Sequence, residues 1–158
     1  MPGTLHILTG KIASGKSTLA KQLAAQPETI LLSEDQLLST LYEGDMNEVT
    51  DYVRNSARLR TGLLPHVSEL LNTGLSVVLD FAANTPDQRD WMRQIIEQSG
   101  CPHILHYLDV SDDICRARMH DRNARGNHPF QPTDEQFDWI TSHFVPPHET
   151  EGFEVQPY

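Results

Sequence analysis

Residues 10 to 17 read Gly10-Lys11-Ile12-Ala13-Ser14-Gly15-Lys16-Ser17, a complete G-x-x-x-x-G-K-S pattern. In this pattern the glycines let the backbone turn so that successive N–H groups point inward at phosphate oxygens. The lysine reaches the β- and γ-phosphates of a nucleoside triphosphate, and the serine hydroxyl is a ligand of Mg²⁺. The alternative interpretation is a chance glycine-rich turn before a helix.

The flanking sequence favours the phosphate-binding interpretation. Residues 5–9 form an apolar run typical of a buried strand, and residues 17–25 carry helix formers with apolar side chains at helical spacing. A strand, a glycine loop and a helix therefore follow one another in the order that the motif requires. The residues expected to bind ATP here are Gly10, Lys11, Ala13, Ser14, Gly15, Lys16, Ser17 and Thr18.

Length and charge limit what is built around the loop. The chain has 158 residues and a formal net charge of −10, which argues against a chain-wide electrostatic surface for nucleic acid. Residues 1–9 are too short and too polar for a secretory leader, and no apolar run approaches the about 20 residues of a membrane span. We therefore expect one soluble cytoplasmic domain over residues 1–158.

Apolar strand-like runs alternate with helical stretches along the chain, which indicates an α/β fold with a parallel sheet. Pro65 is expected to kink or split a long helical region, and residues 127–132 are typical of a loop between two helices. The expected strands after the first are 29–32, 75–80, 103–108 and 153–155. The expected helices are 36–42, 47–72, and three that begin at the capping residues Thr85, Ser111 and Thr133.

Acidic residues follow two of the expected strands. Ligands of an open parallel sheet sit beyond the carboxyl ends of its strands, so Asp35 and Asp80 are placed where chemistry is expected. Asp80 is in position to hold Mg²⁺ with Ser17, or else it caps the next turn. Asp35 is our preferred base for an attacking hydroxyl, with its neighbour Glu34 as the competing residue.

The helix that begins at Ser111 is rich in arginine. Arg118, Arg122 and Arg125 follow a spacing that places them on one helical face, where they suit phosphate oxygens as parts of a lid. Acidic residues nearby also allow a solvated, salt-bridged surface helix.

The chain resembles the small bacterial P-loop kinases that are grouped with zeta toxin, chloramphenicol phosphotransferase and polynucleotide 5′-kinase. The resemblance implies a three-layer α/β/α fold with five parallel strands and the phosphate loop on a central strand. It also implies Mg-ATP as donor, an acceptor pocket near Asp35, catalytic roles for Lys16 and the lid arginines, and an adenine pocket wall at Pro147. The residues that carry it are 10–17, Ser33-Glu34-Asp35, 78–89, 118–125, 144–147 and Glu151-Gly152-Phe153.

One position departs from the polynucleotide kinases of that group. They commonly carry an arginine three residues after the catalytic aspartate, and here that position is Leu38. A leucine cannot hold a phosphate, so the sequence favours an ATP-dependent transfer to a hydroxyl of a small molecule. A nucleic-acid 5′-hydroxyl kinase and a nucleotide-switched binding protein remain as alternatives. The arginines that could hold an acceptor phosphate instead are Arg54, Arg58, Arg60 and Arg89.

Overall fold

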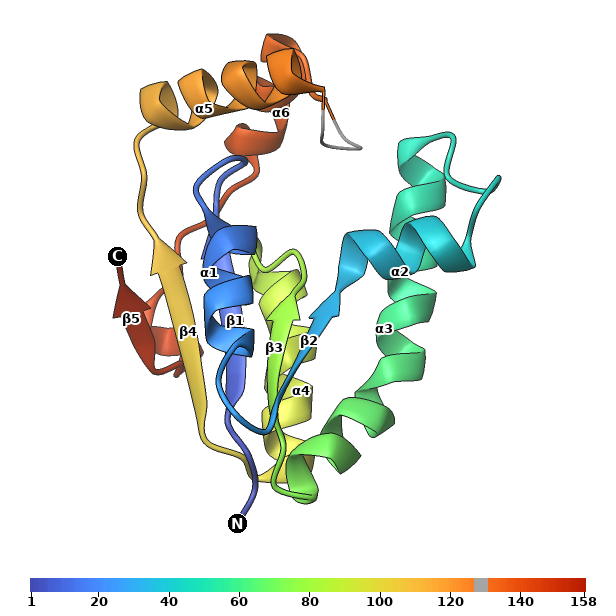
Figure 1. Cartoon of the computed structure of the whole chain (residues 1–158), viewed down its shortest axis with the longest axis vertical. Helices are drawn as coiled ribbons and strands as arrows, with labels where there is room; N and C mark the ends of the chain where they lie inside the picture. Colours follow the sequence, from blue (N-terminus) through green and yellow to red (C-terminus); the bar gives the residue numbers. More distant parts are fainter. Residues whose placement is uncertain (127–130) are drawn as a thin grey trace.

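Five parallel strands form the central sheet of the computed structural model, which describes residues 1–126 and 131–158 (Figure 1). The strand order is β2-β3-β1-β4-β5, so the strand that leads into the phosphate loop is central. The strands are β1 (Leu5–Gly10), β2 (Thr29–Ser33), β3 (Ser76–Asp80), β4 (His103–Leu108) and β5 (Val155–Pro157). The expected five-stranded parallel sheet is thereby confirmed.

Helices cover both faces of the sheet. Helix α1 packs on Leu8, Val78 and Leu108, while α3 and α4 pack on the opposite face around Leu5 and Ile7. The three-layer α/β/α arrangement agrees with the expected fold class. The helices are α1 (Lys16–Ala24), α2 (Glu34–Leu41), α3 (Val49–Asn72), α4 (Pro86–Ser99), α5 (Asp112–Arg125), α6 (Asp134–Ser142) and the short 3₁₀ helix η1 (Glu149–Glu151).

Helix α3 is continuous through Pro65, so of the two expected effects of this residue, a kink or a split, the split does not occur. The missing N–H of a proline removes one backbone hydrogen bond. Buried side chains flank the proline on both sides, Leu59 before it and Val67 and Leu71 after it, and their burial stabilises one continuous helix. This helix changes direction along its length (Figure 1). No helix in the described part of the chain, α3 included, is both long and apolar enough to cross a membrane.

Several element boundaries differ from expectation by one or two residues. Strand β5 begins at Val155, two residues later than expected, because the Glu154 N–H donates to His103 Nε2 at 3.1 Å rather than to a strand carbonyl. Helix α2 begins at Glu34 because the Ser33 hydroxyl accepts from the Gln36 N–H and caps it. The capping roles expected for Thr85, Ser111 and Thr133 are confirmed.

Helices α5 and α6 lie together beyond the carboxyl ends of the strands (Figure 1). Cys115 and Met119 of α5 pack with Phe137 of α6, and this cluster contacts Ile12 and Ala13 of the phosphate loop. We call the segment from α5 to α6 the lid. Within the expected loop at 127–132, residues 127–130 lie outside the described residues.

Candidate active site

The phosphate loop has the tight geometry that its glycines allow. Gly15 precedes α1 with φ 104°, which strains a residue that carries a Cβ. A Cβ on Gly10 would lie 2.5 Å from the Ser14 hydroxyl oxygen and 3.1 Å from the Leu108 carbonyl oxygen, so a larger residue here would require its neighbours to shift. The Ser14 N–H donates to the Lys11 carbonyl at 3.1 Å and closes the turn.

Asn84 anchors the start of this loop, a role that the sequence analysis missed. Its Oδ1 accepts from the Thr9 hydroxyl at 3.1 Å and from the Gly10 N–H at 3.0 Å. Its backbone carbonyl also accepts from the Val145 N–H at 2.8 Å, which attaches the segment after α6. The sequence feature that could have indicated this role is the position of the asparagine shortly after a strand, at the edge of the sheet where ligands bind.

Lys16 is largely enclosed by the loop. Its ammonium donates to the carbonyls of Gly10 and Lys11. Burial lowers the pKa of Lys16 to about 8, and the negative charges of Asp80 and Asp35 oppose that shift. A bound phosphate would supply the anion that this buried cation favours.

Two buried polar atoms at the loop lack hydrogen-bond partners among the described residues: the Ser14 hydroxyl oxygen and Arg122 Nε. Buried polar groups are almost always paired, and such exceptions at a loop of this type fit an anionic ligand. The residues present therefore fit the phosphates of ATP.

Ser17 and Asp80 come together as the sequence suggested. The Ser17 hydroxyl donates to Asp80 Oδ2 at 3.0 Å. Hydroxyl and carboxylate oxygens are ligands that Mg²⁺ prefers, usually with water and substrate phosphates completing the shell. The described residues contain no group of three or more acidic, histidine or cysteine side chains that would hold a metal alone. The pair therefore fits a Mg²⁺ ion shared with nucleotide phosphates.

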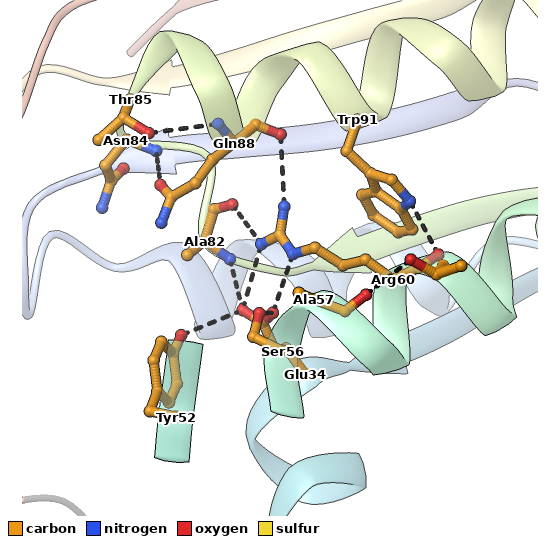
Figure 2. Close-up of polar contacts among 11 residues, drawn as sticks. Glu34, Tyr52, Ser56, Ala57, Arg60, Ala82, Asn84, Thr85, Gln88 and Trp91 are labelled. Carbon is orange, nitrogen blue, oxygen red and sulfur yellow. Dashed lines mark hydrogen bonds and ion pairs between the residues drawn. The ribbon is translucent and has the colours of Figure 1, made fainter. Parts of the chain in front are cut away.

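Glu34 is enclosed in a network of donors (Figure 2). Its side chain is 2 % exposed, and its carboxylate accepts from Ser56 Oγ at 2.7 Å, Arg60 Nε at 3.1 Å and the Ala82 N–H at 3.0 Å. A further donor is Tyr52 Oη at 3.4 Å. Every contact serves to hold α2, α3 and the turn after β3 together.

Asp35, the next residue, is exposed in the first turn of α2. Its negative charge acts on both Lys16 and Arg122, where it favours the protonated form of each side chain. Asp35 therefore belongs to the same electrostatic cluster as the phosphate loop and the lid.

The four arginines considered for an acceptor phosphate are mostly committed elsewhere. Arg60 pairs with Glu34, and its guanidinium stacks 5.0 Å from the Trp91 ring (Figure 2). Arg54 pairs with Asp45 and Asp51, and Arg58 is exposed on the same helix.

Arg89 has no exposed surface. It donates to the Glu151 carboxylate at 2.7 Å and to the Ala83 carbonyl at 2.9 Å, so it is not available to an acceptor phosphate. Leu38 is buried, with 2 % exposure, and belongs to the core.

The lid arginines differ in environment. Arg118 Nη1 donates to the Ser14 carbonyl at 3.4 Å, in contact with the phosphate loop. Arg122 is half-buried, and burial lowers the pKa of its guanidinium. Arg125 forms an exposed ion pair with Asp121, one turn earlier on α5.

Two further predicted binding residues are Lys11, which contacts the start of the lid, and Pro147, which follows the end of the lid in the chain. Lys11 pairs with Asp112 at 2.7 Å and donates to the Val110 carbonyl at 3.2 Å, at the entry to α5. Pro147 is half-buried in the segment after α6, next to Pro146, whose carbonyl lies 3.5 Å from Arg89 Nη2.

The sheet order and the phosphate loop give this chain a P-loop kinase-like fold. Over residues 5–147 the sequence matches the family described as AAA domain, and the chain therefore belongs to this family. No curated protein matches the chain by sequence.

Solved structures share the fold. A candidate kinase from Chloroflexus aurantiacus is 22 % identical with a TM-score of 0.75, covering 99 % of this chain and 85 % of its own. The Mycobacterium tuberculosis APS kinase CysC, solved with AMPPNP and APS, is 20 % identical with a TM-score of 0.64, covering 99 % and 88 %. The Pnkp1/Rnl/Hen1 RNA repair complex matches at 16 % identity and a TM-score of 0.63, covering 91 % and 47 %.

Proposed function

We propose that this protein transfers the γ-phosphoryl group of Mg-ATP to a hydroxyl of a small-molecule acceptor. The observation that carries the proposal is the cluster at the carboxyl ends of the strands. The negative charge of Asp35 acts there on both Lys16 and Arg122. The Ser17 hydroxyl lies 3.0 Å from the Asp80 carboxylate. The solved APS kinase, which was bound to an ATP analogue, supports ATP as the donor.

Each side chain has a defined task in this reaction. Lys16 and Arg122 attract the charge of the transferring group, while Ser17 and Asp80 hold the Mg²⁺ that neutralises charge on the phosphates. The acceptor hydroxyl oxygen forms a bond to the γ-phosphorus while the bond between that phosphorus and the leaving ADP oxygen breaks. Asp35 accepts the proton that the acceptor hydroxyl loses. Arg118 is assigned to the triphosphate and Arg125 to lid closure, with Pro147 beside the adenine.

Glu34 is the less suitable base. Its carboxylate already accepts from Ser56, Arg60 and the Ala82 N–H, and an acid held this way has no free direction toward an acceptor. Asp35 carries the assignment because it is exposed and its charge acts on the phosphate-loop lysine.

A polynucleotide 5′-hydroxyl kinase is the second candidate, favoured by the likeness to the RNA repair complex. Charge argues against it, because the chain carries −10 overall and Arg54 and Arg60 are held in ion pairs. Binding to oligonucleotides that weakens steeply with salt would support this alternative.

The direct test mixes purified protein and Mg-ATP with pools of alcohols, nucleosides and a 5′-hydroxyl oligonucleotide. Mass spectrometry then searches for a species heavier by one phosphoryl group, with Lys16→Ala as the inactive control. A phosphorylated small alcohol is the expected result. Loss of ATP with no phosphorylated acceptor would contradict the proposal and favour a nucleotide-switched binding protein.

A further inference from the structure

A groove of about 300 Å³ separates the start of α3 from α6. Two of its apolar side chains are exposed to solvent: Val49 is 67 % and Trp139 is 59 % exposed. Its volume is at the lower end of the range for small-molecule sites, about 300–1,000 Å³. The groove is lined by Val49, Glu135, Gln136, Trp139 and Ile140.

One wall of the groove is formed by the first turn of α3, the helix that also contacts the start of α2. Tyr52 lies one turn after Val49 on α3, and its hydroxyl lies 3.4 Å from the carboxylate of Glu34, the neighbour of Asp35. Burial raises the pKa of Tyr52, and the negative charges of Glu34 and Asp35 act in the same direction. The first turns of α3 therefore connect the groove to the proposed base.

The opposite wall belongs to the lid. Phe137 of α6 packs with Cys115 and Met119 of α5, in the cluster that contacts the phosphate loop. A molecule in the groove therefore lies between the acceptor side of the fold and the segment that carries Arg118 and Arg122.

Trp139 is held in place from its own helix. The His143 ring lies 4.4 Å from the indole, centre to centre, and His143 Nδ1 lies 2.8 Å from the Trp139 carbonyl. Asp134 and Asp138, on the same helix, pair with Arg116 of α5 and fix α6 against it. An aromatic surface ordered in advance loses little freedom when a ligand packs on it.

The charges around the groove disfavour an anionic ligand. Arg54 is engaged by Asp45 and Asp51, and Arg116 is engaged by two aspartates of α6. The ionisable residue that lines the groove is Glu135, an acid. A phosphate or carboxylate on the acceptor would therefore meet negative charge and no uncommitted cation among the lining residues that the structure describes.

We propose that this groove binds the aromatic body of an uncharged alcohol and presents its hydroxyl to Asp35. The inference rests on the proposed kinase activity and adds the chemical class of the acceptor. Trp139 and Val49 supply the apolar contact, and Glu135 at the groove selects against anionic compounds.

The test compares three compounds that share one reacting 1,2-diol end: 1-phenylethane-1,2-diol, glycerol and glycerate. We expect kcat/KM for phosphoryl transfer to be at least about tenfold higher for the phenyl diol. Trp139→Ala should raise KM for the phenyl diol about tenfold without changing KM for ATP, and Trp139→Phe should retain most of the affinity. Ile114→Ala, at an exposed apolar position of α5 outside the groove, is the matched control.

Saturation-transfer NMR on the phenyl protons provides a second readout without ATP. Equal use of the three compounds, or no effect of Trp139→Ala, would overturn the groove assignment and leave the kinase proposal intact. Transfer to none of them, with a saturation signal that Trp139→Ala removes, would retain the groove as an aromatic site but overturn its role in presenting the acceptor hydroxyl to Asp35, while the pooled-acceptor assay decides the kinase proposal independently. Absence of both transfer and signal would overturn the assignment.

Discussion

Arg60 Nε lies 3.1 Å from Glu34 Oε2, and the pair is buried between α3 and the first turn of α2. The two residues are 26 positions apart in the chain, and Arg60 also donates to the Ala82 carbonyl at 2.8 Å. One ion pair thus fixes the helix that carries Asp35 relative to the turn after Asp80.

Arg60→Met is expected to lower the free energy of unfolding by about 3–5 kcal/mol, because it leaves the Glu34 carboxylate buried without its cation. Urea denaturation followed by circular dichroism measures the change. Arg58→Met, at an exposed position of the same helix, should stay within about 0.5 kcal/mol of the wild type. Equal urea midpoints for Arg60→Met and wild type would show that the pair contributes nothing.

ATP affinity is expected to fall as the pH rises above about 8. Burial lowers the pKa of Lys16 from 10.5 to about 8 in the free protein, and bound phosphates favour the protonated lysine. The pKa in the complex is therefore the higher one, so binding takes up a proton between the two values. Calorimetry in two buffers of different ionisation enthalpy measures this uptake. Lys16→Met should bind weakly and without this pH dependence, and a constant wild-type affinity across the range would refute the linkage.

Asp35→Asn is expected to reduce kcat about 100-fold or more while the Kd for ATP stays within about twofold, since the amide cannot accept the acceptor proton. Transfer rate and nucleotide affinity are measured on the same preparation. Asp113→Asn, an exposed aspartate at the start of α5, serves as the control. Wild-type turnover in Asp35→Asn would remove this residue from the role of base.

Asp80→Asn and Ser17→Ala are each expected to raise the Mg²⁺ concentration needed for half-maximal activity by about tenfold. Each change removes one of the two oxygens that lie 3.0 Å apart at the phosphate loop. A Mg²⁺ titration at fixed ATP measures the shift, and Asp87→Asn, exposed at the start of α4, is the control. Unchanged Mg²⁺ requirements in both variants would contradict the metal assignment.

Local features of this fold were predictable from the sequence. The phosphate loop, the cap at Thr85 and the cap at Ser111 each depend on residues a few positions apart, so their patterns are visible in the chain. Strand β4 also has the predicted bounds, because its apolar run is flanked by clear turn residues.

The partners of the buried arginines were not predictable. Arg60 meets Glu34 across 26 residues, and Arg89 meets Glu151 across 62, and no local pattern encodes either pairing. Arginine is usually an exposed residue, so the sequence left both available for an acceptor. Burial commits them to the fold.

Asn84 and Pro65 illustrate two further limits. The contact of Asn84 with Gly10 depends on the turn after β3 folding back toward the phosphate loop, which composition does not reveal. Pro65 obeys its local rule by removing a hydrogen bond, but the packing of a 24-residue helix outweighs it. The groove at Trp139 likewise depends on how α6 approaches α3.

Both ends of the lid are linked by hydrogen bonds or ion pairs to residues 10 and 11 of the phosphate loop, the exit through Asn84. At its entry Lys11 reaches Asp112 and the Val110 carbonyl, and at its exit Val145 bonds to Asn84, whose side chain holds the Gly10 N–H. Contacts at both ends of the lid therefore lead to residues 10 and 11 of the phosphate loop. A displacement of Gly10 and Lys11 would therefore act on the contacts at the entry and at the exit of the lid at the same time.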